Sequence, residues 1–173
     1  MEQQKMITPD YLWRPMTQHK TLLNNRPKHI VKGEGCFMIN DEGNRILDAT
    51  AGLWCVNVGH GRKALAEVAS EQMEKLAYVI PVMTSAPAVE LSGTMLEMLD
   101  MERGHVYFTS SGSEANETAF KIVRQYHMQS GNHRKTKIIS RHRAYHGNTL
   151  ATMTATGQAE RKIGFEPLAP GFL

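Results

Sequence analysis

Apolar residues recur at helical spacing in two stretches of the first hundred residues. Residues 62–78 bring Leu65 and Val68 to one face while glutamates occupy other faces, which predicts an amphipathic helix. Residues 88–99 show the same spacing and follow Pro87, a residue that a first helical turn accommodates because the missing N–H has no partner there. We therefore expect two helices in this part of the chain.

A third amphipathic stretch lies between two short apolar runs. Residues 105–110 (HVYFTS) and 136–140 (TKIIS) have the composition of strands, and residues 113–129 between them carry Ala119 and Ile122 on one stripe. Strand, crossover helix and strand form a βαβ unit. This order predicts a parallel sheet covered by helices.

The N-terminal region has a different pattern. Residues 1–25 are polar, with two aromatic residues and two prolines, which suits an irregular arm. Residues 29–50 contain short β-prone runs separated by Gly33, Gly35 and Gly43. We expect two or three short antiparallel strands there, with turns at the glycines.

Composition and charge exclude several classes of protein. The chain has 173 residues, 41% hydrophobic and 21% charged, values typical of globular proteins and unlike low-complexity classes. Its formal net charge of +3 hints at anionic ligands without requiring nucleic acid. No secretory leader or membrane-spanning run is visible, and Cys36 and Cys55 have no metal or redox spacing. We expect a cytoplasmic protein with no membrane partner and two reduced, buried thiols.

The turn FTSSGSEAN, residues 108–116, is the first candidate for chemistry. Ser111 and Glu114 have the spacing of a capping box, and Gly112 allows close approach of another group to the backbone. Unpaired N–H groups at the helix start, with the hydroxyls of Ser111 and Ser113, can hold a phosphate. A well-capped helix without a ligand is the alternative. The P-loop and dinucleotide motifs are absent.

The segment RHRAYHGNT, residues 141–149, follows the next predicted strand and should emerge at the same sheet edge, where ligands of open α/β sheets collect. The ring of Tyr145 can stack on a flat heteroaromatic ligand, with Gly147 leaving space; alternatively its hydroxyl anchors the loop. Trp54 lies in a glycine-flanked loop, and its alternative role is core filling.

Two further readings receive less support. His142 and His146 are four residues apart, but without a third ligand we predict no metal site. A stretch poor in acidic residues could contact nucleic acid, but we favour a solvated basic face because no nucleic-acid-binding signature accompanies it. Its basic residues are Lys121, Arg124, Arg134, Lys135, Lys137, Arg141 and Arg143.

Taken together and in this order, five segments resemble the N-terminal part of class III aminotransferases, which depend on pyridoxal 5'-phosphate (PLP). They are LWRPMTQHK, DATAGLWCVNVGHG, APAVELS, FTSSGSEANETAFKIVRQYH and RHRAYHGNTLATMTATG. The resemblance implies an α/β, fold-type I transferase that works as a homodimer or higher homo-oligomer. Residues 1–60 would hold the arm and a small antiparallel meander. Residues 61–173 would hold part of the PLP-binding large domain, with a mainly parallel sheet and covering helices.

The resemblance also implies roles for individual residues. The phosphate-binding turn falls on Ser111, Gly112 and Ser113, and the ring-stacking aromatic residue falls on Tyr145. Trp54 matches the substrate-pocket tryptophan, and the arm would bring Met16 near the same pocket. The form AGLWC resembles the ω-amino acid:pyruvate branch, which includes taurine and β-alanine enzymes. The implied reaction moves an amino group from an amine donor to pyruvate and yields alanine.

The sequence departs from the family at the catalytic centre. The family needs a Schiff-base lysine and an acid on the pyridinium nitrogen, and none of the ten lysines here matches that lysine's motif. We therefore expect a fragment of a larger transaminase that is inactive alone. Its half sheet should leave apolar strand and helix faces uncovered, so we also expect poor solubility or dependence on the remainder. The alternatives are a same-fold aminomutase, decarboxylase or racemase, or a phosphate- or nucleic-acid-binding module.

Overall fold

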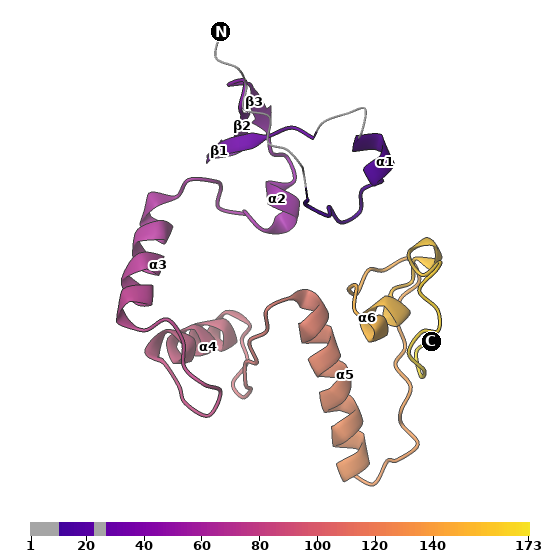
Figure 1. Ribbon diagram of the computed structural model, residues 1–173. Helices are drawn as coiled ribbons and strands as arrows, with labels where there is room; N and C mark the ends of the chain where they lie inside the picture. Colours follow the sequence, from indigo (N-terminus) through magenta and orange to yellow (C-terminus); the bar gives the residue numbers. More distant parts are fainter. Residues whose placement is uncertain (1–10, 23–26) are drawn as a thin grey trace. The chain divides into compact units, whose positions relative to one another are not determined.

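The computed structural model describes residues 11–22 and 27–173 (Figure 1). The chain divides into two compact units, Met1–Ile80 and Pro81–Leu173, and each is described here by itself. The division expected at residue 60 concerns the domains of a whole transaminase and stays a prediction.

The first unit is built on a three-stranded antiparallel sheet in the order β1-β2-β3. Its strands are β1 (Ile30–Glu34), β2 (Phe37–Asn40) and β3 (Arg45–Leu47). Gly35 (φ 56°) and Gly43 (φ 83°) lie between the strands with positive φ, which glycine adopts without steric cost. The expected meander is confirmed. The expectation of a turn at Gly33 is wrong, because this residue pairs with Met38 inside β1.

The predicted helices form, with small shifts of their ends. The first unit also holds α1 (His19–Leu22), α2 (Ala51–Trp54) and α3 (Lys63–Lys75). The second unit holds α4 (Ala86–Met98), α5 (Gly112–Gln129), α6 (Leu150–Ala155) and a 3₁₀ turn, Ala159–Arg161. Pro87 lies in the first turn of α4, as expected.

The two strands predicted around α5 do not form as strands. Residues 105–110 have no strand assignment, and in residues 136–140 only Ile138 makes a bridge, which is parallel and pairs it with Phe172. That pairing rests on two bonds, from Ile138 N–H to the Gly171 carbonyl (2.8 Å) and from Leu173 N–H to the Ile138 carbonyl (2.9 Å). A strand is defined by hydrogen bonds to a neighbour, so an apolar extended segment without one stays irregular.

Little of the described chain is buried. The second unit has its buried side chains on and just after α6, at Thr152, Ala155 and Thr156, and the first unit buries Asn40. The apolar stripes of α3, α4 and α5 remain exposed, including Leu65, Val68, Val89, Met95, Ile122 and Val123. This confirms that helix faces are left uncovered. No helix among the described residues is long and apolar enough to cross a bilayer.

The two cysteines differ from expectation. Cys36 and Cys55 are free thiols, as predicted, but both are exposed rather than buried. Cys36 lies in the turn between β1 and β2, and Cys55 follows α2. Both positions lie outside the hydrogen-bonded strands, where side chains face solvent.

Candidate functional site

The start of α5 has the geometry of a capped helix. Ser111 is the N-cap, and its hydroxyl oxygen accepts a hydrogen bond from Glu114 N–H at 3.2 Å. The Glu114 carboxylate accepts from the backbone N–H of Ser110 at 2.7 Å, one residue before the position that a standard capping box uses. The predicted cap is therefore confirmed, with Ser110 rather than Ser111 as the partner of the glutamate.

This helix start has unused donors. The N–H groups of Gly112 and Ser113 have no acceptor among the described residues, as expected for the first turn of a helix. A Cβ built on Gly112 would meet no atom within 4 Å, so the space beside the turn is open. Free N–H groups at the positive end of an 18-residue helix suit a phosphate. The residues present therefore fit the phosphate of PLP.

Hydrogen bonds join this turn to the loop that carries Tyr145. The Ser113 hydroxyl donates to Asn148 Oδ1 and accepts from Asn148 N–H, both at 3.1 Å. One turn further along α5, the side-chain amide of Asn116 donates to the carbonyl of His146 at 2.8 Å. The two loops proposed from the sequence therefore lie side by side. The asparagines that connect them were not singled out, although both lie inside the quoted motifs.

Gly147 is required at this junction. Its φ is +138°, and a Cβ there would lie 2.5 Å from Ser113 Oγ and 2.6 Å from Thr152 Oγ1. On the other side of the loop, the fully buried Thr156 hydroxyl accepts from His146 N–H at 3.0 Å and donates to the Thr152 carbonyl. The loop is thus fixed between α5 and α6. The hydroxyls of Ser113 and Thr152 occupy the space in which a side chain at position 147 would lie.

The ring of Tyr145 is available for stacking. The residue is 57% exposed, and the guanidinium carbon of Arg161 lies over the ring, 5.3 Å from its centroid. A guanidinium at this distance makes a cation–π contact with one face of the ring. Arg161 is held in turn by the side chain of Gln158, which donates to the carbonyl of Arg143. The opposite face of the ring is the one that a planar ligand can use.

Trp54 lies at the end of a strained turn in the first unit. The φ angles of Ala51, Gly52, Leu53 and Trp54 are 48°, 59°, 60° and 66°, so α2 is a left-handed turn. Left-handed backbone costs about 1–2 kcal/mol for each L-residue other than glycine, hence about 3–6 kcal/mol for these three non-glycine residues. Trp54 is 77% exposed, so it fills no core within the described residues. Such strain persists only where the surrounding structure holds it.

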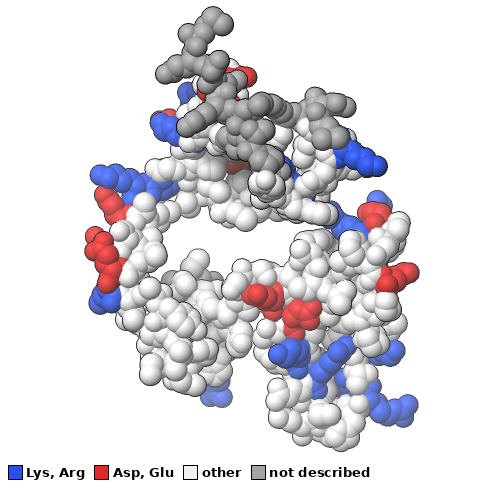
Figure 2. Space-filling view, in the orientation of Figure 1, with Lys and Arg blue, Asp and Glu red and all other residues white. Residues whose placement is uncertain are grey.

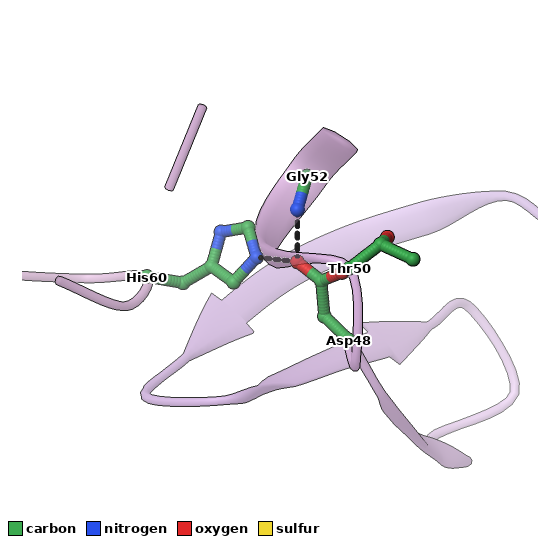
Figure 3. Close-up of polar contacts among 4 residues, drawn as sticks. All are labelled: Asp48, Thr50, Gly52 and His60. Carbon is green, nitrogen blue, oxygen red and sulfur yellow. Dashed lines mark hydrogen bonds and ion pairs between the residues drawn. The ribbon is translucent and has the colours of Figure 1, made fainter. Parts of the chain in front are cut away.

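A single carboxylate connects the two ends of this loop (Figure 3). Asp48 Oδ2 accepts from Gly52 N–H at 2.8 Å and lies 2.9 Å from His60 Nε2, while Oδ1 accepts from the Thr50 hydroxyl at 3.2 Å. The Gly52 N–H and then the His60 side chain hold the pKa of Asp48 below its ordinary value. Both residues lie in the quoted motif DATAGLWCVNVGHG, but their pairing was not predicted.

Met16 belongs to the N-terminal arm. It has φ 51° and its side chain is 80% exposed. Met16 and Trp54 lie in the first unit, whereas Ser111, Gly112, Ser113 and Tyr145 lie in the second.

Two other features lie outside these residues. The basic side chains singled out above belong to α5 and the segments that follow it, where Figure 2 shows Lys and Arg gathered.

A pocket in the second unit has a volume of about 300 Å³ and contains none of the predicted site residues. Its lining consists of Ser140, Arg141, His142, Thr154, Thr156, Gly157, Lys162, Phe172 and Leu173.

Comparison with known proteins defines the class. The family model of class III aminotransferases matches residues 21–173. The chain therefore belongs to the class III aminotransferases, whose cofactor is PLP, and the expected fold-type I class is confirmed.

Within this family, the chain is similar to several individual proteins. An uncharacterized aminotransferase of Bacillus subtilis (strain 168) is 54% identical over 142 residues, covering 82% of this chain and 31% of the relative. The taurine–pyruvate aminotransferase of Bilophila wadsworthia (strain 3_1_6) is 43% identical over 164 residues, covering 94% and 35%. The structure of the ω-transaminase from Pseudomonas jessenii in complex with PMP (pyridoxamine phosphate) has TM-score 0.88 and 34% identity, covering 94% and 36%. The chain thus spans about a third of the length of each.

Proposed function

We propose that these residues are the N-terminal portion of an aminotransferase that moves an amino group from an ω-amino acid or amine, of the taurine or β-alanine type, to pyruvate. Family membership supports amino-group transfer, and the similarity to a taurine–pyruvate aminotransferase supports this donor and acceptor pair. The parent enzyme is proposed to be cytoplasmic and a homodimer or higher homo-oligomer.

One observation carries the proposal. The paired hydrogen bonds between Ser113 and Asn148 fasten a helix start with free N–H groups to the loop of an exposed aromatic ring. A ligand with an anionic tail and a flat ring needs both features close together.

Each residue then has a physical role. The N–H groups of Gly112 and Ser113 hold the phosphate, and Ser111 can donate its hydroxyl proton to it because its oxygen already accepts from Glu114. The Ser113 hydroxyl already donates its hydrogen bond to Asn148 Oδ1, so the role of Ser113 is to position the loop. Tyr145 covers the pyridine ring, with Arg161 against its far face. When bound, PLP supplies the electron sink that allows a proton to leave the amine-bearing carbon.

The first unit is proposed to supply residues that contact the amine donor. Trp54 and Met16, both exposed, offer apolar contacts to the carbon chain of the donor. They do not form covalent bonds with it, so we expect them to change donor preference more than the chemical step. The Schiff-base lysine is proposed to lie outside this chain, which is therefore expected to be inactive alone.

A hybrid enzyme tests this function. The segment of the Bilophila wadsworthia enzyme that corresponds to this chain is replaced by it, and alanine formation from pyruvate is measured with taurine, β-alanine and simple amines. We expect turnover by the hybrid and none by the 173-residue chain alone. The unmodified relative is the control.

Several results would contradict the proposal. Turnover by the chain alone would refute the proposal that the Schiff-base lysine lies outside it. A soluble, PLP-loaded hybrid that forms no alanine would refute the assignment of the amine donor and of pyruvate as acceptor. Retention of the amine in the product would favour an aminomutase, and release of carbon dioxide a decarboxylase. Salt-dependent binding of mixed oligonucleotides by the chain would favour the nucleic-acid-binding alternative.

A further inference from the structure

The left-handed turn at Trp54 needs an external restraint. Its backbone bonds, from Trp54 N–H to the Thr50 carbonyl (2.9 Å) and from Cys55 N–H to the Ala51 carbonyl (2.9 Å), would be equally available to a right-handed turn. Because L-residues favour the right-handed form, these bonds do not explain the observed hand. Trp54 is 77% exposed, so packing of its side chain does not explain it either.

Asp48 supplies a restraint that depends on the hand of the turn. Its Oδ2 atom receives Gly52 N–H from inside the turn and faces His60 Nε2 from the far end of the loop (Figure 3). The side chain of Asp48 is 4% exposed and that of His60 is 23% exposed, so the contact between these two side chains is partly shielded from water, whereas Gly52 is exposed. A single oxygen thus fixes the direction of the Gly52 N–H relative to the end of the loop.

The sheet provides a rigid base for this carboxylate. Asp48 follows β3 directly, and its N–H donates to the Cys36 carbonyl at 2.8 Å. His60 is bound to Gly35 by two backbone hydrogen bonds, at 2.8 and 3.1 Å. A Cβ on Gly33 would lie 2.6 Å from the His60 ring, so the ring lies directly on the backbone of β1. Asp48 and His60 are therefore both anchored to the β1–β2 hairpin.

From this geometry we infer that Asp48, with His60, is a positioning residue that sets the orientation of Trp54 by holding the left-handed turn on the sheet. The link to donor specificity rests on the proposed function, in which Trp54 contacts the donor. The restraint itself does not, because all of its contacts lie within the first unit. The two claims can therefore fail separately.

The test uses the hybrid enzyme described above, because the 173-residue chain alone is expected to be poorly soluble. The Trp54 signal is the difference between each variant and the same variant carrying Trp54→Phe. Near-ultraviolet circular dichroism reports the order of the Trp54 ring, and hydrogen exchange reports the amides of Gly52, Trp54 and Cys55. In Asp48→Ala, we expect the Trp54 signal to fall by at least half and these amides to exchange at least tenfold faster. Asp48→Asn keeps an oxygen that can accept from Gly52 N–H, so most of the signal should return.

The matched control is Asp41→Asn. Asp41 also faces a histidine, His29, at 3.7 Å in the same unit, but the two side chains are 39% and 56% exposed. This variant should leave the Trp54 signal unchanged. The inference is overturned if Asp48→Ala matches the parent, if Asp41→Asn loses as much signal, or if the amides of β1 and β2 lose protection to the same extent. It is also overturned if the parent hybrid enzyme shows no ordered Trp54 signal.

Discussion

Two loops present the exposed aromatic rings of the proposed enzyme, and they are held by different chemistry. The Trp54 loop depends on one carboxylate that joins residues 12 apart in the sequence and rests on a completed antiparallel sheet. The Tyr145 loop depends on neutral hydrogen bonds to α5, across 30 to 35 residues, and on the hydroxyls of α6. Changes in the charge of Asp48 should therefore affect the Trp54 loop. Added volume at the contact with α5 should affect the Tyr145 loop.

The largest expected effect is in the Tyr145 loop. Gly147→Ala places a Cβ 2.5 Å from Ser113 Oγ and 2.8 Å from the buried Thr152 Cβ, at a φ that alanine disfavours. We expect local stability to fall by about 2–5 kcal/mol, combining backbone strain and overpacking. Hydrogen exchange at Asn148 N–H, which donates to Ser113, measures this loss.

Gly112→Ala is the matched control for that substitution. Its added Cβ meets nothing within 4 Å, so without cofactor the exchange at Asn148 should change by less than about 0.5 kcal/mol. In the PLP-loaded hybrid enzyme, the same methyl group would lie in the space assigned to the phosphate and should weaken PLP binding. If both substitutions open the loop equally without cofactor, the steric account of the junction is wrong.

A smaller effect is expected from Thr156→Val. This hydroxyl accepts from His146 N–H and is fully buried, so the valine leaves that donor without a partner. The expected loss is about 1–3 kcal/mol of local stability, seen as faster exchange at His146. Thr94→Val is the control, because this exposed hydroxyl in α4 donates to the Glu90 carbonyl and accepts from no backbone N–H among the described residues. Equal effects of the two variants would contradict a special role for the buried hydroxyl.

The difference between the loops also explains what the sequence could predict. The helices and the antiparallel meander follow from nearby residues, through apolar spacing and glycines such as Gly35 and Gly43, and they form. Residues 105–110 were wrongly predicted as a strand because composition cannot supply a hydrogen-bonded neighbour, and parallel pairing joins segments that are distant in sequence. Residues 136–140 find part of such a neighbour in Phe172.

The candidate residues show the same limit. The cap at Ser111 was predictable because its partner lies three residues away, whereas the bonds of Asn116 and Asn148 connect loops about 30 residues apart. The left-handed backbone at Trp54 could not be predicted, because aromatic residues rarely adopt positive φ. Asp48 and His60 at the two ends of the motif were the available signal for the restraint.

Ser111→Ala should have a modest effect, on α5 rather than on either loop directly. The alanine removes the acceptor of Glu114 N–H, which costs about 1 kcal/mol at an N-cap. Fraying of the first turn should appear as faster exchange at Glu114 and Ala115, with the end of α5 near Gln129 unchanged. Ser111→Asn, which restores an N-cap oxygen, should recover most of the protection; if it does not, capping is not the reason for the loss.

The smallest effect, a titration at acid pH, separates the two loops by charge. The contacts of Asp48 lower its pKa below 3.8, so its stabilising contribution is complete above that value and is lost as the pH falls through the lowered pKa. In the hybrid enzyme, the Trp54 signal should therefore persist at pH 4 and decline only slightly below it, because a protonated carboxyl still offers an oxygen to Gly52 N–H. Asp48→Asn has no carboxylate to protonate, so that step should be absent, while Asp41→Asn should keep it. Exchange at Asn148, whose partner is the neutral Ser113 hydroxyl, should show no matching step once intrinsic pH effects are removed. A shared acid transition in both loops would mean that the charge of Asp48 does not distinguish them.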